Sequence, residues 1–180
     1  MYWVACFGDS LIQGFPFSKQ YSWIAEVEKQ KNIKMLNYGI CGECCDDIFV
    51  RLKNTVLSEY IQHIIFFGGA NDLLQKRPQK FILEDLSNVC LWCKQAGYQL
   101  CIVLPLISGD EKFNIYLQEL RRKMQAELAD KCFLLDLQPA VGTGSGELKK
   151  AYLDCVHPTA AMYKKMGAYA APIIEKWIET

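Results

Sequence analysis

A serine near the start of the chain and an aspartate and a histidine near its end are the residues best suited to chemistry. Ser10 stands in Phe7-Gly8-Asp9-Ser10-Leu11, directly after the apolar run 2–6. A serine hydroxyl is a weak nucleophile that needs a base to take its proton. His157 lies three residues after Asp154, so a single loop can supply the base and the carboxylate that orients its ring. Taken alone, Gly-Asp-Ser is also a common turn sequence, and His157 alone could be a capping or surface histidine.

Acyl transfer also needs hydrogen-bond donors for the oxyanion that develops on the substrate. Gly42 can bring its backbone N–H close to a substrate because no side chain blocks the approach. Asn71 offers a side-chain amide, and the N–H of Ser10 is a third candidate donor. The alternatives are a turn glycine and a helix N-cap asparagine. The other histidine, His63, begins an apolar run and is expected to be structural.

Strand-like and helix-like segments alternate along the chain. Strands are expected at 2–6, 34–38, 63–67, 98–104 and 132–137. Helices are expected at about 20–31, 45–56, 82–97, 113–128 and 159–178, and Pro172 should kink or restart the last one. This alternation predicts an α/β fold, a flavodoxin-like three-layer α/β/α sandwich with a five-stranded parallel sheet in the order 2-1-3-4-5. Residues 1–180 are expected to form one domain.

The expected topology brings the chemistry-bearing segments together. Ser10, Gly42 and Asn71 each follow a different strand, and Asp154 and His157 precede the last helix. In open parallel sheets the ligand crevice lies at the carboxyl ends of the strands. The glycine-rich segment 142–146 is not followed by the Lys-Ser/Thr pair of a P-loop and is expected to be a flexible surface loop. The sequence therefore predicts one serine-hydrolase site at this edge, with no metal and no cofactor.

The composition limits the kinds of partner that the chain is expected to bind. Lys plus Arg equals Asp plus Glu at 20 each, so nothing indicates a nucleic-acid partner, which would need a basic stripe. The apolar run 64–70 is too short to cross a bilayer, and no secretory signal is evident. The nine cysteines are expected to be mostly buried reduced thiols, which indicates a cytoplasmic setting. A zinc site built from the pairs Cys41/Cys44 and Cys90/Cys93 is a weaker alternative.

The four segments resemble blocks of the SGNH hydrolase family, the GDSL-type esterases and lipases. The matching stretches are Gly8-Asp9-Ser10-Leu11, Asn37-x-Gly39-x-x-Gly42, Gly69-Ala70-Asn71-Asp72 and Asp154-Cys155-Val156-His157. The resemblance implies a Ser10 nucleophile, a His157–Asp154 base pair, and an oxyanion hole made by Ser10, Gly42 and Asn71; Gly39 is the less favoured register for the glycine. It also implies metal-independent hydrolysis of esters or thioesters, and the length is similar to the compact bacterial esterase/thioesterase/lysophospholipase branch.

The substrate is the least determined feature. Apolar residues that follow strand ends could line an acyl pocket, and they are Leu73, Leu74, Leu106 and Ile107, with Phe15, Phe17 and Phe113 as further candidates. A small acyl ester, thioester or lysophospholipid-like molecule is the expected partner. An acyltransferase, or a deacetylase acting on acylated sugars, would use the same triad. A flavodoxin-like binding module would need a phosphate-cradling loop after the first strand, and Leu11-Ile12-Gln13 fits that poorly.

Overall fold

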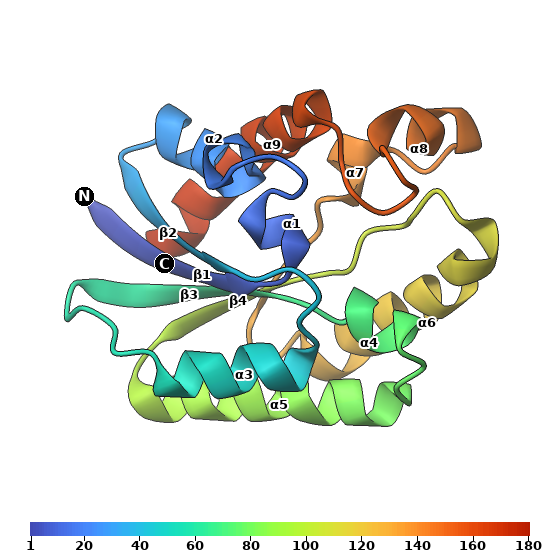
Figure 1. Cartoon of the computed structure of the whole chain (residues 1–180). Coiled ribbons are helices and arrows are strands. Elements are labelled where there is room, and N and C mark those ends of the chain that lie inside the picture. Colours follow the sequence, from blue (N-terminus) through green and yellow to red (C-terminus); the bar gives the residue numbers. More distant parts are fainter.

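Five parallel strands form the central sheet of the computed structural model, which describes all 180 residues. The strands are β1 (Tyr2–Gly8), β2 (Ile33–Gly39), β3 (Ile61–Phe67), β4 (Gln99–Val103) and β5 (Phe133–Leu135). Their order is β2-β1-β3-β4-β5, as the sequence predicted (Figure 1). The register aligns the ends of all five strands, because Gly8 pairs with Gly39 and Phe67, and Val103 pairs with Phe67 and Leu135.

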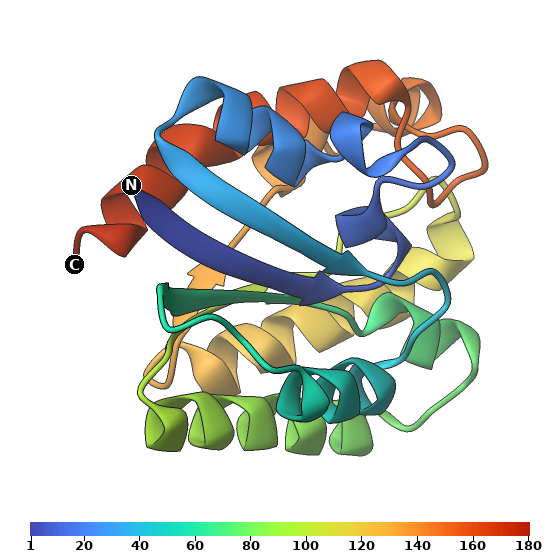
Figure 2. The ribbon, with the colours of Figure 1, turned by 60° about the vertical axis from the view of Figure 1, so that its left-hand side comes forward.

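Helices cover both faces of the sheet, which is why the strands are apolar nearly throughout rather than alternating. Within β1, Val4 and Cys6 belong to one core cluster, and Ala5 and Phe7 belong to the other. The first cluster lies under helices α1, α2, α7, α8 and α9, and the second under α3 and α5 with most of the buried face of α6. Figures 1 and 2 show these two helical layers on opposite sides of the strands. The sandwich architecture predicted from the sequence is confirmed.

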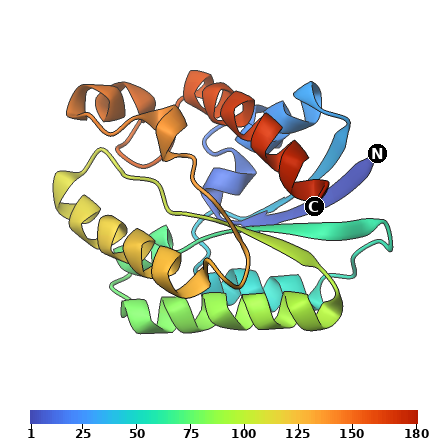
Figure 3. The same cartoon turned by 180° about the vertical axis from the view of Figure 1, so that it is seen from behind.

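The helices run from the carboxyl edge of the sheet back toward its amino edge. Their bounds are α1 (Ser10–Gln13), α2 (Trp23–Gln30), α3 (Cys45–Asn54), α4 (Ala70–Leu74), α5 (Gln79–Ala96), α6 (Glu111–Leu128), α7 (Gln138–Val141), α8 (Ser145–Ala151) and α9 (Ala160–Ile178), with a 3₁₀ turn, η1, at Lys19–Tyr21. Both chain ends lie on the same side of the molecule, at the amino edge of the sheet (Figure 3). No helix is sufficiently long and apolar to span a membrane.

Two local expectations need correction. Of the kink or restart expected at Pro172, the restart is wrong, because the last helix is continuous from Ala160 to Ile178. Pro172 and Ala168, whose carbonyl loses its intrahelical partner, both face solvent, so water can replace the missing hydrogen bond. The segment 142–146 is not loop throughout, because Ser145 and Gly146 begin α8. Its Glu147 carboxylate accepts the N–H groups of Gly144 and Thr143, at 2.9 and 3.1 Å, and so caps that helix.

Close packing at the carboxyl edge depends on a glycine at the end of β2. A Cβ atom on Gly39 would lie 2.2 Å from the backbone N of Gln13 and 2.7 Å from its Cα. These are backbone atoms of α1, so they can move away only if the whole turn that carries Ser10 moves. Gly39 is therefore needed for packing between the first two strand ends and α1.

We predict that Gly39→Ala lowers the free energy of unfolding by about 1–3 kcal/mol, the usual cost of overpacking a well-packed site. Urea denaturation followed by circular dichroism measures the change. The matched control is Gly146→Ala, since a Cβ there meets no atom within 4 Å and alanine favours the helix. A Gly39→Ala protein as stable as the control would contradict this packing argument.

Candidate active site

The structure brings the serine and the histidine into hydrogen-bonding contact, although 147 positions separate them in the chain. His157 Nε2 lies 3.0 Å from Ser10 Oγ. The other ring nitrogen, Nδ1, lies 2.7 Å from Asp154 Oδ2. A carboxylate at Nδ1 favours the tautomer with its proton there, which leaves Nε2 free to accept the serine proton. The three side chains thus have the geometry required for nucleophilic catalysis.

The loop that carries Asp154 and His157 is held by backbone hydrogen bonds. An isolated antiparallel bridge joins Tyr152 to Pro158, and the N–H of Leu153 donates to the carbonyl of His157 at 2.9 Å. Within this loop Cys155 has a left-handed backbone, with φ of 72°. Its carbonyl accepts the N–H of Gly109 at 2.7 Å, which ties the loop to the segment after β4. These contacts fix the height of the imidazole above the sheet edge.

Hydrogen bonds keep Asp154 ionised. Partial burial by itself would raise the pKa of Asp154, but hydrogen bonds from the His157 ring and from the backbone N–H groups of His157 and Val156 outweigh it and lower the pKa below its ordinary value. The backbone bonds measure 2.8 Å from His157 and 3.2 Å from Val156. The carboxylate can therefore orient the imidazole and stabilise its protonated form.

Ser10 begins the short helix α1 and is nearly buried, at 6% exposure. The preceding residue, Asp9, caps this helix by accepting the N–H of Leu11 at 2.9 Å. Gly14 ends it with a φ of 93°. The ring of Phe15 then packs edge-on against His157, with centroids 4.7 Å apart. One strand end and one turn of helix therefore position both the nucleophile and an apolar wall for the base.

The candidate oxyanion donors lie on loops that follow β2 and β3. Gly42 is exposed, has a φ of +83°, and has no atom within 4 Å of where a Cβ would stand. Gly39 is instead packed against α1, so its surroundings favour Gly42 as the donor glycine. The amide of Asn71, in the first turn of α4, donates to the carbonyl of Glu43 at 2.9 Å. This bond joins the two oxyanion segments to each other.

Arg51, on α3, holds the donor loop in place and was not singled out from the sequence. Its guanidinium donates to the carbonyl of Tyr38 at 2.6 Å and to that of Gly8 at 3.2 Å. It also forms an ion pair with Glu43, with Nε at 3.0 Å from each carboxylate oxygen. Arg51 therefore ties the ends of β1 and β2 to the loop that carries Gly42. The eight-residue separation of Glu43 and Arg51, across a loop and a helix, gives no local pattern by which to find the pair.

The predicted substrate-contacting residues fall into three groups. Leu73 and Leu74 line a pocket of about 630 Å³ together with Phe113 and Tyr116. Ile107 lines a second pocket, of about 640 Å³, which Asp154 and Cys155 also border. Leu106 is buried in the core and lines neither pocket. Phe17 packs against the same core cluster.

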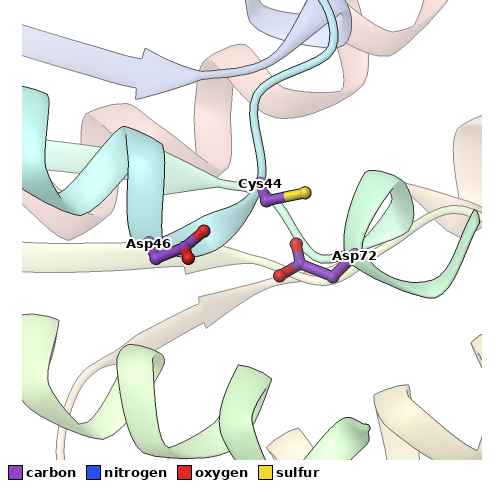
Figure 4. Close-up of side chains that lie close together, drawn as sticks. All are labelled: Cys44, Asp46 and Asp72. Carbon is purple, nitrogen blue, oxygen red and sulfur yellow. The ribbon is translucent and has the colours of Figure 1, made fainter. Parts of the chain in front are cut away.

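Three potential metal ligands, Cys44, Asp46 and Asp72, lie close together near this edge (Figure 4). Arg77 already supplies positive charge there, since its guanidinium lies 2.8 Å from Asp72 and 3.6 Å from Asp46. The second oxygen of Asp72 accepts the N–H of Cys45 at 3.0 Å. Burial and the nearby carboxylates raise the pKa of Cys44 to about 12, so its thiol is protonated. The residues present form an ion-pair cluster that fits a metal ion poorly.

Neither the cysteine pairs nor His63 joins the site. Cys41 and Cys44 lie at the carboxyl edge of the sheet, before α3, whereas Cys90 and Cys93 lie in the second half of α5, toward the amino edge. The two pairs therefore cannot form one four-thiolate site. His63 is buried within β3 between the rings of Tyr2 and Trp177, where burial lowers its pKa.

Known proteins share both the sequence pattern and the fold. The model of the GDSL-like lipase/acylhydrolase family matches residues 6–165. A member of the lipolytic protein G-D-S-L family from Veillonella parvula superposes with a TM-score of 0.86 at 21% identity, over 98% of this chain and 100% of that one. A member of a carbohydrate acetylesterase family from Sinorhizobium meliloti gives 0.75 at 16% identity, with both chains fully covered.

One curated relative is the lipoprotein YqeF of Bacillus subtilis, an uncharacterized protein that is 23% identical over 128 residues. The match covers 63% of this chain and 53% of YqeF, so the chain spans about half the length of this relative.

We predict that Arg51→Ala lowers the free energy of unfolding by about 2–3 kcal/mol, because it leaves the half-buried Glu43 carboxylate without its cation and removes a donor from the carbonyls of Tyr38 and Gly8. Chemical denaturation measures the loss, and Lys53→Ala, an exposed change on the same helix, is the control. Equal stabilities for the two variants would show that Arg51 does not brace the loop.

Proposed function

The chain belongs to the GDSL-like lipase/acylhydrolase family, and we propose that it hydrolyses carboxylic esters or thioesters through Ser10, His157 and Asp154. The observation that carries this proposal is the 3.0 Å contact between His157 Nε2 and Ser10 Oγ. This contact supports Ser10 as the nucleophile and His157 as its base, with Asp154 on the opposite side of the imidazole ring. The predicted family, and with it an enzyme of the esterase and acylhydrolase type, is confirmed.

In the acylation half of the proposed mechanism, His157 takes the proton of Ser10 as the hydroxyl oxygen attacks the acyl carbonyl. Asp154 stabilises the imidazolium that forms. The backbone N–H groups of Ser10 and Gly42 and the amide of Asn71 donate to the tetrahedral oxyanion. The imidazolium then protonates the leaving alcohol or thiol, and the acyl group remains on Ser10.

Deacylation repeats these steps with water. His157 takes a proton from the water as it attacks the acyl-enzyme, and the same three donors hold the second oxyanion. Collapse of that intermediate releases the carboxylic acid, and His157 returns the proton to Ser10. An alcohol in place of water would give acyl transfer, so product analysis distinguishes the hydrolase from the transferase.

The substrate is proposed to extend into the pocket at Ile107, which Asp154 borders, or toward the pocket at Leu73 and Leu74, or into both. The pocket at Leu73 and Leu74 is the more apolar-walled candidate for an acyl chain, because Phe113 and Tyr116 add aromatic surface. The pocket at Ile107 carries hydroxyl and amide side chains, which suit a polar alcohol such as a sugar. Activity on p-nitrophenyl esters of increasing chain length, compared with acetylated sugars, discriminates these two substrate classes.

Two features weigh against a nucleotide- or flavin-binding module. Leu11 and Ile12, which follow Ser10, are buried side chains of α1, so this turn presents no open cradle for a phosphate. Ser10 itself is engaged with His157.

We keep the cytoplasmic location as a proposal, which nine free cysteines support.

We predict that Ser10→Ala abolishes ester turnover, because no other hydroxyl stands against the imidazole. Release of p-nitrophenol from a short-chain ester measures the loss, and retained secondary structure shows that the fold persists. Activity near that of the wild type would exclude Ser10 as the nucleophile.

We predict that Asn71→Ala lowers kcat by roughly 10²–10³, the usual cost of removing one oxyanion donor, with a small change in KM. Steady-state kinetics on the same ester separates the two constants. An increase in KM with an unchanged kcat would mean that Asn71 binds substrate rather than the oxyanion.

A further inference from the structure

We propose that Asp9 is a positioning residue that holds the Asn71 amide in its oxyanion-binding orientation, through the carboxylate oxygen that faces that amide. This inference rests on the proposed function, since it assigns Asn71 an oxyanion to bind. It gives Asp9 a role beyond capping α1.

The two oxygens of Asp9 have different partners. Oδ1 accepts the N–H of Leu11 at 2.9 Å and caps α1. Oδ2 points across to α4, where it lies 3.5 Å from Nδ2 of Asn71. The same Nδ2 donates to the carbonyl of Glu43 at 2.9 Å. The nitrogen end of the amide is thus bracketed by two acceptors.

This bracket decides which way the amide points. If the Asn71 side chain were rotated by half a turn, its oxygen would face both the Glu43 carbonyl and Asp9 Oδ2, and like partial charges would meet. An ionised Asp9 therefore favours the orientation in which the N–H groups of Asn71 face Glu43 and Asp9, the residue next to Ser10. Because the contact to Asp9 is long, it is weak, and its hydrogen can be passed to an oxyanion.

Asp9 lacks the cation that usually accompanies a buried carboxylate. It is 2% exposed and forms no salt bridge, whereas the other fully buried aspartate, Asp72, is paired with Arg77 at 2.8 Å. The pKa of Asp9 is raised to about 7, because burial and the charge of Asp72, which raise it, outweigh the N–H of Leu11 and the charge of His157, which lower it. A structural cap alone would not need this arrangement, since exposed aspartates cap helices equally well.

The groups that face Asp9 from its surroundings are His157 in the triad loop, Asp72 in α4, Cys41 after β2, Cys45 in α3 and Tyr163 in α9. Burial raises the pKa of both thiols and of the phenol, so all three are neutral in the range of interest. Among these neighbours, His157 is the one whose charge changes in the proposed mechanism.

Protonation of Asp9 would remove one of the two acceptors that hold the amide nitrogen of Asn71. Because Oδ1 is occupied by the Leu11 N–H, the proton goes to Oδ2, and the oxygen facing Asn71 changes from acceptor to donor. Asp9 is mostly ionised above about pH 7 and protonated below it, so the amide is held at alkaline pH and released at acid pH. Asp9→Asn imitates the protonated state at every pH, because its oxygen can still cap Leu11 while its NH₂ faces Asn71.

The test is the pH dependence of the ratio of kcat in the wild type to kcat in Asp9→Asn, on a neutral p-nitrophenyl ester. We expect a ratio of about ten at pH ~8.5, with KM changed less than about twofold, falling toward one at pH ~5. A ratio that stays constant with pH, or equals one throughout, overturns the proposal.

Two further variants separate positioning from folding. Asp110→Asn makes the same change at the cap of α6, where the carboxylate accepts the Lys112 N–H at 2.9 Å, and it should leave kcat unchanged. In an Asn71→Ala background Asp9→Asn should have no further effect on kcat, because its effect passes through that amide. If the losses in kcat from the two substitutions add instead, Asp9 does not act through Asn71 and is a structural residue only. Ser10→Ala run in parallel shows whether the proposed function itself fails, since an active Ser10→Ala enzyme removes the premise independently of Asp9.

Discussion

The architecture depends on one contact, between an imidazole near the end of the chain and a hydroxyl near its beginning. A 3.0 Å separation of His157 Nε2 and Ser10 Oγ requires two loops from distant parts of the sequence to be placed to within a few tenths of an ångström. The aligned register of the strand ends achieves the coarse placement. Local hydrogen bonds to the backbone achieve the fine placement. Asp9 caps α1 next to Ser10, and the bridge between Tyr152 and Pro158 closes the loop that carries Asp154 and His157.

Behind that contact lies a layer of polar side chains that connect the strand ends to one another. Arg51 joins the carbonyls of Gly8 and Tyr38 to the Glu43 carboxylate, and the Glu43 carbonyl in turn accepts the Asn71 amide. Buried polar groups are costly unless they are partnered, so such a layer holds its members in one arrangement. That is the property an oxyanion hole needs, because its donors must be in place before charge develops.

The sequence was most informative where a residue's role depends on its immediate neighbours. Unbroken apolar runs predicted all five strands because helices cover both faces, and the parallel topology placed Ser10, Asn71 and His157 at one edge. It was least informative where partners are distant in the chain. Arg51 is an ordinary surface-like arginine by pattern, and its three partners come from β1, β2 and the loop after β2. Leu106 looked like a pocket residue because it follows a strand, yet it is buried in the core, and α8 escaped notice because glycines hid the cap that Glu147 provides.

The central claim, that Ser10 is activated by His157, is tested most directly by covalent trapping. A fluorophosphonate reacts with a serine only when a neighbouring base makes its oxygen nucleophilic, and the adduct is stable to mass spectrometry. The account predicts one adduct per chain, found on the peptide that contains Ser10, and little or no labelling when His157 is replaced by alanine. Labelling at another residue, or undiminished labelling of Ser10 without His157, would contradict it.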